Sequence, residues 1–180
     1  MRKTLVLLLS AVLWIGILSG CNRTEPENTE NSTQTETTEP VRYAAPDFTV
    51  YDRDGNAVTL SDFIVKPVVL NFWATWCGPC VQELPHFQEQ YDKLGEQVQF
   101  LMVNLTDGTR ETVTGVGEFL QAEGYTFPVL YDTATSAASI YQIYSIPTTY
   151  FIDKEGYLVA GATGALSAEQ LQQGIGMIWK

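Results

Sequence analysis

Apolar residues divide this chain into three stretches of different character. Residues 5–18 form an apolar run, whereas residues 22–40 contain no leucine, isoleucine, valine or aromatic residue. From Val41 onward, short apolar runs with the period of strands alternate with longer stretches that have helical spacing. The pattern therefore predicts one folded domain over residues 41–180, preceded by two segments of a different nature.

Strands and helices are predicted to alternate within the folded region. Residues 48–51 and 57–60 flank a Gly-containing loop, which is typical of a hairpin. The nearly continuous apolar run over residues 67–73 favours a strand that is buried on both faces. Further strands are predicted over residues 97–104, 128–131, 148–152 and 157–162. Helices are predicted over residues 77–94, 109–122, 134–141 and 167–178. This order argues for an α/β fold with a mixed central sheet flanked by helices.

Two of the predicted helices carry specific local signals. Ser167 is followed three residues later by Gln170, which matches a capping box, so the last helix should begin there. Pro85 lies inside the helix predicted over residues 77–94. Since proline lacks the N–H that a helix interior needs, we expect it to bend this helix.

The first 20 residues have the organisation of an export signal. Arg2 and Lys3 precede an apolar run that is shorter than the roughly 20 residues of a membrane-spanning helix, which favours a signal peptide. The run ends in residues 18–21, Leu-Ser-Gly-Cys, and resembles the bacterial lipoprotein signal. The resemblance implies that residues 1–20 are removed and that a lipid on Cys21 anchors the protein to the membrane. The alternatives are an unmodified Cys21 in a simple secretory signal and an uncleaved anchor.

The polar stretch before the domain predicts a tether, and the net charge of the chain bears on its partners. Residues 22–40 cannot bury enough apolar area to offset the entropy of ordering, so with Cys21 they are predicted to form a flexible acidic tether. The formal net charge of the whole chain is −11, and loss of Arg2 and Lys3 would change it to −13. Such a surface repels phosphate backbones, and we therefore expect no nucleic-acid partner.

The strongest chemical signal is Trp76-Cys77-Gly78-Pro79-Cys80, at the junction of a predicted buried strand and a helix. A helix N-terminus leaves N–H groups free and carries partial positive charge, which stabilises a thiolate and lowers its pKa. Two intervening residues let the sulfurs close a small disulfide ring, and Pro79 suits a first helical turn. We predict that Cys77 is the exposed nucleophile and that Cys80 is the shielded thiol that resolves a mixed disulfide.

Two other uses of this cysteine pair are open. One is half of a zinc site, which normally needs four ligands. The remaining candidates are Cys21, assigned to the lipid, and His86, the single histidine. The other is a static structural disulfide, although a C-x-x-C at a strand-to-helix junction is more typical of redox chemistry. We predict a redox-active Cys77–Cys80 disulfide without a metal or cofactor.

The residues around the cysteines resemble a known family. Residues 72–80, FWATWCGPC, look like the thioredoxin superfamily, and several other stretches are similar to its TlpA/ResA-like branch. These stretches are APDF at 45–48, Gly55, LSD at 60–62, and IPTTYFID at 146–153 with a Gly156 turn. The resemblance spans Val41 to Lys180. It implies a thioredoxin-like fold with an N-terminal β-hairpin and a strand-helix insertion between Asn104 and Pro128.

The resemblance also assigns residues to a client-binding groove. Pro147 matches the family's cis-proline beside the disulfide, where Ile146 would present its backbone to an extended client. The alternative is an ordinary trans proline. We expect Trp76, Gly78 and Pro79 to contribute to this groove next to the cysteines, whereas Trp73 should belong to the core.

Glu83 is predicted to handle protons for the cysteine pair. It lies one helical turn beyond Cys80, where the TlpA/ResA-like branch has a buried acid. Such a carboxyl group would have a raised pKa and could exchange protons with Cys80. Thioredoxin's own buried aspartate is replaced here by Asn71, which cannot titrate. The alternative for Glu83 is a solvent-facing helical residue.

Three competing functions fit the sequence less well than a disulfide reductase does. A peroxiredoxin-like peroxidase needs Pro and Thr seven and three residues before its cysteine, but Leu70 and Ala74 occupy these positions. A copper metallochaperone of this fold separates its cysteines by three residues and needs a distant histidine. This chain separates Cys77 and Cys80 by two residues and has no such histidine. A non-catalytic binding lipoprotein would not need an intact cysteine pair.

The resemblance implies an extracytoplasmic, membrane-anchored thiol-disulfide oxidoreductase that reduces protein disulfides. Gly-Pro between the cysteines resembles reducing thioredoxins. The implied electron donor is a membrane thiol-electron transporter. The implied clients are protein disulfides, such as those of apocytochrome c, an exported methionine sulfoxide reductase or other misoxidised envelope proteins.

Overall fold

A computed structural model of the chain describes residues 41–179. The contacts divide the chain into Met1–Glu39 and Pro40–Lys180, and every element below belongs to the second unit. The predicted export signal, the lipid on Cys21 and the acidic tether lie outside the described residues. Among the residues that are described, no helix is both long enough and apolar enough to cross a membrane.

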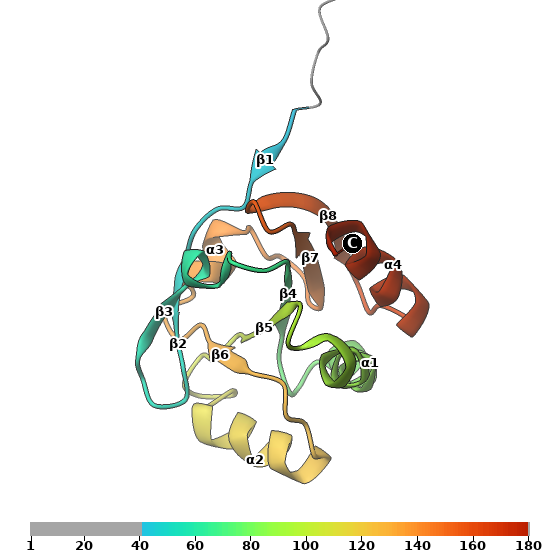
Figure 1. Cartoon of the computed structure of the whole chain (residues 1–180). Coiled ribbons are helices and arrows are strands. Elements are labelled where there is room, and N and C mark those ends of the chain that lie inside the picture. The colour runs from blue at the N-terminus through green and yellow to red at the C-terminus, as the bar shows by residue number, and fades with distance from the viewer. Residues whose placement is uncertain (1–40, 180) are drawn as a thin grey trace, which may run out of the picture. The chain divides into compact units, whose positions relative to one another are not determined.

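In this part of the chain, eight strands form one mixed sheet in the order β1-β8-β7-β4-β5-β6-β2-β3 (Figure 1). The pairs β4–β5 and β5–β6 are parallel, and the other neighbours are antiparallel. The strands are β1 (Tyr43–Ala44), β2 (Thr49–Tyr51), β3 (Ala57–Thr59), β4 (Val68–Trp73), β5 (Gln99–Asn104), β6 (Val129–Tyr131), β7 (Thr148–Ile152) and β8 (Tyr157–Thr163). The predicted N-terminal hairpin is therefore β2–β3, and it extends the sheet beyond β6.

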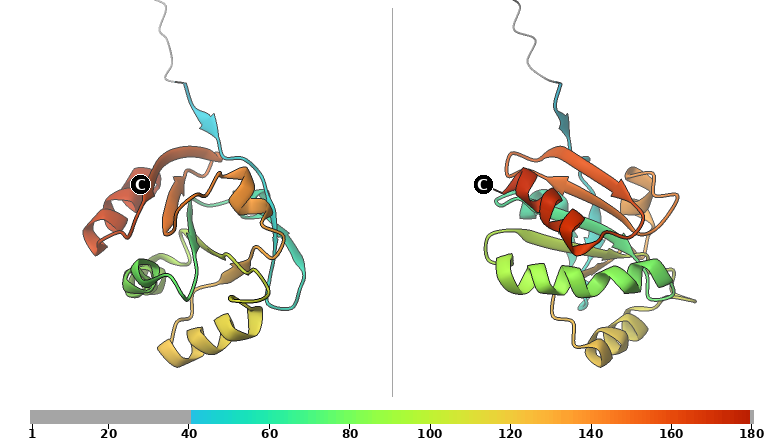
Figure 2. Two further views of the ribbon diagram at one scale, coloured as in Figure 1. Left: turned by 180° about the vertical axis from the view of Figure 1, so that it is seen from behind. Right: turned by 90° about the vertical axis from the view of Figure 1, so that its right-hand side faces the viewer.

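Helices cover both faces of the sheet. They are α1 (Gly78–Leu94), α2 (Val113–Glu123), α3 (Ser136–Ile140), α4 (Ala168–Ile178) and the 3₁₀ helix η1 (Leu60–Phe63). The helices α1 and α4 pack against each other on one face, as both views in Figure 2 show. Figure 1 shows η1 and α3 on the opposite side of the sheet. The region between Asn104 and Pro128, where a strand-helix insertion was predicted, contains the helix α2 and no strand. The strand β6 follows this helix and lies just beyond Pro128.

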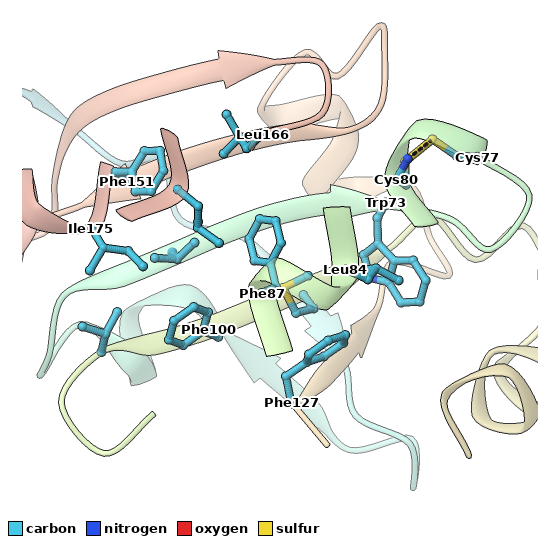
Figure 3. Packing of buried hydrophobic residues seen from close by; sticks show 14 of the residues in the cluster. Trp73, Cys77, Cys80, Leu84, Phe87, Phe100, Phe127, Phe151, Leu166 and Ile175 are labelled. Atoms are coloured by element: carbon cyan, nitrogen blue, oxygen red, sulfur yellow. Dashed lines mark hydrogen bonds between the residues drawn. A yellow bond between two sulfur atoms is a disulfide. The ribbon is translucent and has the colours of Figure 1, made fainter. Parts of the chain in front are cut away.

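The central strand β4 separates two apolar clusters by the alternation of its side chains. Val69 and Trp73 pack into the cluster under α1, α2 and α4 (Figure 3), whereas Leu70 and Phe72 pack into the cluster under η1 and α3. All four are fully buried, which confirms the prediction of a strand covered on both faces. Each large buried apolar side chain contributes roughly 1.5–3 kcal/mol. Within the described residues 41–179 these clusters form an extensive core on each face of the sheet, so we expect residues 41–180 to fold on their own.

Local capping signals explain where the helices begin. Ser167 and Gln170 form the predicted capping box at the start of α4. The helix α2 begins at Val113 rather than near residue 109, because Thr112 caps it by accepting a hydrogen bond from the Gly115 N–H. The helix α1 continues through Pro85 without interruption. Neither β1 nor η1 was predicted, since each is very short and has no periodic apolar pattern of its own.

Candidate active site

The two cysteines lie where the chain leaves β4 and enters α1. Cys77 is the N-cap residue of α1, and its sulfur forms a disulfide with Cys80 in the first turn. The backbone N–H of Cys80 donates to the Cys77 Sγ at 3.2 Å (Figure 3). Cys77 is only 6% exposed, so it is nearly buried rather than exposed as predicted, because the disulfide and the Ile146 segment lie against it. Cys80 is completely buried. The small exposed area of the pair therefore belongs to Cys77.

The segment before β7 places a backbone carbonyl beside this disulfide. The Ile146–Pro147 peptide bond is cis, which confirms the prediction from the sequence. The Ile146 carbonyl oxygen lies 3.6 Å from the Cys77 Sγ, although the residues are 69 positions apart in sequence. Ile146 is partly exposed and Pro147 is buried. An extended chain that reaches the sulfur of Cys77 would therefore pass the backbone of Ile146.

The other three residues that are predicted to line a client groove neighbour Cys77 in the sequence, and all three are exposed. Trp76, Gly78 and Pro79 are exposed, and 43% of Trp76 is open to solvent. Trp73 is completely buried, as predicted. A Cβ added at Gly78 would meet nothing within 4 Å, so this position is open. The surface next to Cys77 therefore combines an aromatic ring with exposed backbone.

Glu83 lies inside the protein, so the alternative of a solvent-facing residue is wrong. Only 1% of it is exposed. Its Oε1 accepts from the Asn71 Nδ2 at 2.9 Å, and its Oε2 accepts from the backbone N–H of Leu166 at 2.7 Å. The same Asn71 nitrogen donates to the Thr149 hydroxyl at 3.0 Å. Burial raises the pKa of Glu83 to about 7 even though both hydrogen bonds lower it. A carboxyl group with this pKa can both donate and accept a proton near neutral pH.

A second buried acid near the cysteines, Glu111, was not predicted. It is 2% exposed and accepts from the backbone N–H and the hydroxyl of Thr75 at 2.7 and 2.6 Å. It also accepts from the Asn104 Nδ2 at 2.6 Å. In the sequence, Glu111 lies in a polar stretch 36 positions from Thr75 and looks like a surface residue. No local signal indicates that it is buried.

Comparison with known proteins places the chain in a family. The family model described as AhpC/TSA matches residues 41–160. The thiol-disulfide oxidoreductase ResA of Geobacillus thermodenitrificans is 34% identical over 174 residues, which cover 96% of this chain and 91% of that protein. The chain belongs to the ResA family of thiol-disulfide oxidoreductases. The predicted family and enzyme class are thereby confirmed.

Solved structures confirm the thioredoxin-like fold for this ResA-family chain. A putative thiol:disulfide interchange protein DsbE from Chlorobium tepidum has a TM-score of 0.63 and 31% identity, covering 74% of this chain and 94% of that one. The exposed lipoprotein thioredoxin Etrx1 of Streptococcus pneumoniae has a TM-score of 0.62 and 32% identity, covering 71% and 96%.

The residues that precede Cys77 do not fit the peroxidase alternative. Leu70 and Ala74 occupy the positions where that alternative needs proline and threonine, and both are fully buried apolar residues. Ala74 has no hydroxyl group that could bind a peroxide. The surroundings of Cys77 therefore fit a disulfide oxidoreductase better than a peroxidase.

Proposed function

We propose that this protein is an extracytoplasmic, membrane-anchored reductase of protein disulfides, with Cys77 as nucleophile and Cys80 as resolving thiol. The asymmetry of the pair carries the proposal, because Cys77 keeps 6% of its surface exposed whereas Cys80 has none. In the reduced protein, the Cys80 N–H that now contacts the Cys77 sulfur would stabilise a Cys77 thiolate.

The proposed reaction has two exchange steps. The Cys77 thiolate attacks one sulfur of a client disulfide, which forms a mixed disulfide and releases one client thiolate. The Cys80 thiolate then attacks the Cys77 sulfur, releases the second client thiolate and forms the Cys77–Cys80 disulfide. Two electrons pass from the enzyme dithiol to the client, and the released thiolates take up two protons. The Ile146 backbone and the exposed Trp76, Gly78 and Pro79 would hold the client segment during the attack.

Glu83 is proposed to take the proton of Cys80 during the second step. A buried thiol ionises reluctantly because burial raises its pKa. Glu83 is one helical turn away on α1, and burial has raised its own pKa to about 7. The carboxylate can therefore accept a proton near neutral pH and return it when the disulfide is reduced again.

A reductase must regain electrons after each cycle. We propose a membrane thiol-electron transporter as the donor, because the proposed anchor holds the domain at the membrane surface. Apocytochrome c, an exported methionine sulfoxide reductase and other misoxidised envelope proteins are the proposed clients. Trapping clients on a Cys80→Ser variant, followed by mass spectrometry, would identify which of them is used.

Membrane attachment is proposed from residues 18–21 and is supported by one relative. The Streptococcus pneumoniae thioredoxin that matches this chain is described as an exposed lipoprotein. We propose that residues 1–20 are a signal peptide and that residues 21–40 tether the domain to the lipid on Cys21. Labelled fatty acid should enter the natural chain but not the Cys21→Ala variant. Labelling of that variant would contradict the lipid assignment.

The function is tested with residues 41–180. This domain should reduce the interchain disulfides of insulin when a dithiol regenerates it, which is measured as turbidity. In a matched assay with hydrogen peroxide, it should consume peroxide no faster than free dithiol does. Absence of insulin reduction would contradict the proposed function, and rapid peroxide consumption would favour the peroxidase alternative.

A further inference from the structure

The loop between β5 and α2, residues 105–112, is attached to the segment that precedes the nucleophile. Its Glu111 carboxylate accepts both hydrogen-bonding groups of Thr75, one on each oxygen. The Oε1 that accepts from the Thr75 N–H also accepts from Asn104, at the end of β5. Glu111 therefore links a central strand to the residue two positions before Cys77.

The β5–α2 loop is itself ordered by Asp107. The backbone of Glu111 is therefore fixed by Asp107, and its carboxylate is fixed by Thr75 and Asn104. Asp107 Oδ1 accepts from the backbone N–H groups of Thr109, Arg110 and Glu111 at 2.8, 2.8 and 3.0 Å. The Gly108 N–H donates to the Glu111 carbonyl at 2.9 Å. These bonds fix the backbone that carries the Glu111 side chain, so that its carboxylate needs little reorganisation to meet Thr75.

The residue before Glu111 contacts the same segment from outside. The Arg110 guanidinium lies 4.1 Å from the centre of the Trp76 ring, a cation–π contact. Trp76 is partly exposed and directly precedes Cys77. Two consecutive loop residues therefore hold Thr75 from the interior and Trp76 from the surface.

The segment between β4 and α1 needs such support because it has no regular structure. Ala74 and Trp76 lie between Trp73, the last residue of β4, and the N-cap Cys77. The bond from the Cys77 N–H to the Ala74 carbonyl, at 3.2 Å, closes a turn but does not anchor it to the rest of the domain. Burying a carboxylate is costly unless it is hydrogen-bonded, and here three donors compensate it.

We propose that Glu111 is a positioning residue that orients the Thr75–Trp76–Cys77 segment for extended disulfide clients. The inference rests on the proposed function, because it assumes that clients bind along Ile146 and Trp76. An extended client would use the whole surface around Cys77, whereas a small disulfide needs only the sulfur. Loosening the segment should therefore impair the reduction of peptide disulfides more than that of small ones.

The test uses single-turnover reduction by the reduced domain, residues 41–180. One substrate is a pair of ten-residue peptides joined by a disulfide, and the other is a small aromatic disulfide. Glu111→Ala should slow the peptide reaction by about 10- to 100-fold, the range expected when a reacting group is misplaced by about an ångström. It should slow the small disulfide less than about threefold, since that reaction needs little orientation.

Two further variants cover the case in which Glu111→Ala does not fold. Glu111→Gln keeps one acceptor oxygen for the Thr75 and Asn104 N–H groups and should lose less activity on the peptide. Thr75→Val removes only the hydroxyl contact and should cause a smaller defect on the peptide than Glu111→Ala does, because the Thr75 and Asn104 N–H groups can still donate to Glu111. The fluorescence of Trp76 is obtained by subtracting the spectrum of the same protein with Trp76→Phe. This fluorescence should differ between the wild-type domain and the Glu111 variants, because the segment that contains Trp76 is displaced.

The matched control is Asp153→Ala. Asp153 also organises a turn, by accepting from the N–H groups of Glu155 and Tyr157, but it follows β7 at the end where Ile152 pairs with Val68. This variant should leave the ratio of the two rates unchanged. Equal losses on both substrates in the Glu111 variants, or no loss, would overturn the inference. A wild-type domain that reduces neither substrate would instead overturn the proposed function, and this inference with it.

Discussion

Glu83 and Asp107 both accept hydrogen bonds from nearby N–H groups, but they lie in opposite surroundings. Glu83 is buried behind the disulfide, and the loss of water raises its pKa to about 7. Asp107 is exposed in the β5–α2 loop, where hydrogen bonds from the backbone of Glu111 and Thr109 lower its pKa to about 2. Access of water to the charged form therefore decides the direction of the shift.

The opposite pKa shifts of Glu83 and Asp107 suit these two residues to different roles near the cysteine pair. The inner region, around Glu83 and Cys80, contains a carboxyl group that can change its charge near neutral pH. The outer region, around Asp107 and Trp76, contains a carboxylate that stays charged at every physiological pH. The inner region is suited to proton transfer, and the outer region is suited to holding the loop in a fixed shape.

The largest expected effect tests whether Cys77, next to the outer region, is the nucleophile and Cys80, in the inner region, is the resolving thiol. Cys77→Ser should lower insulin reduction by at least about 1,000-fold, because the attacking thiolate is removed. Cys80→Ser should still form mixed disulfides through Cys77 but should not resolve them, which intact-mass spectrometry would detect. Most of the activity persisting in Cys77→Ser would show that the accessible sulfur is not the nucleophile.

The next effect tests the inner region alone. Glu83→Gln keeps the shape of the side chain and removes its titration, so resolution of the mixed disulfide should slow by roughly 10- to 1,000-fold. The deficit should shrink as the pH rises and Cys80 ionises unaided. A pH profile of single-turnover resolution measures this directly. Superimposable profiles for the two proteins would remove Glu83 from the mechanism.

The same carboxyl group should make the oxidised domain less stable as the pH rises. The pKa of Glu83 is about 7 in the folded protein against an ordinary 4.5, so between these values the folded state binds more protons than the unfolded state. Stability should fall by about 3 kcal/mol across this window, since each pKa unit corresponds to about 1.4 kcal/mol. Urea unfolding at several pH values should show a correspondingly weaker decline for Glu83→Gln. Parallel curves would contradict the raised pKa.

The smallest effect belongs to the outer region. The lowered pKa of Asp107 means that its contribution to stability is present above the ordinary value of 3.8 and is lost as the pH falls through about 2. Because Asp107 is exposed and Asn can accept similar bonds, Asp107→Asn should lower the unfolding temperature at pH 7 only slightly, and the difference should vanish near pH 1.5. Calorimetry at both pH values measures this. If the difference in unfolding temperature between the two proteins widened in acid, the lowered pKa of Asp107 would be contradicted.

Much of the fold follows from local signals in the sequence. The hairpin over β2 and β3, the buried strand β4 and the capping box at Ser167 each depend on residues a few positions apart. The two-residue strand β1 was missed because it exists only through pairing with β8. The start of α2 was misplaced because side-chain bonds from Asp107 hold residues 109–111 outside the helix.

The sequence by itself determined the chemistry of the site. A C-x-x-C pair at a strand-to-helix junction specifies two thiols of unequal access, and the residues around it specify the family. The environment of those thiols was decided only by the tertiary structure. The Ile146 carbonyl approaches Cys77, and Asn71 and Leu166 enclose Glu83, because β7, β4 and the segment before α4 meet at one end of the sheet. Desolvation and hydrogen bonding depend on groups that are distant in sequence, and the pairing of Glu111 with Thr75 is decided in the same way.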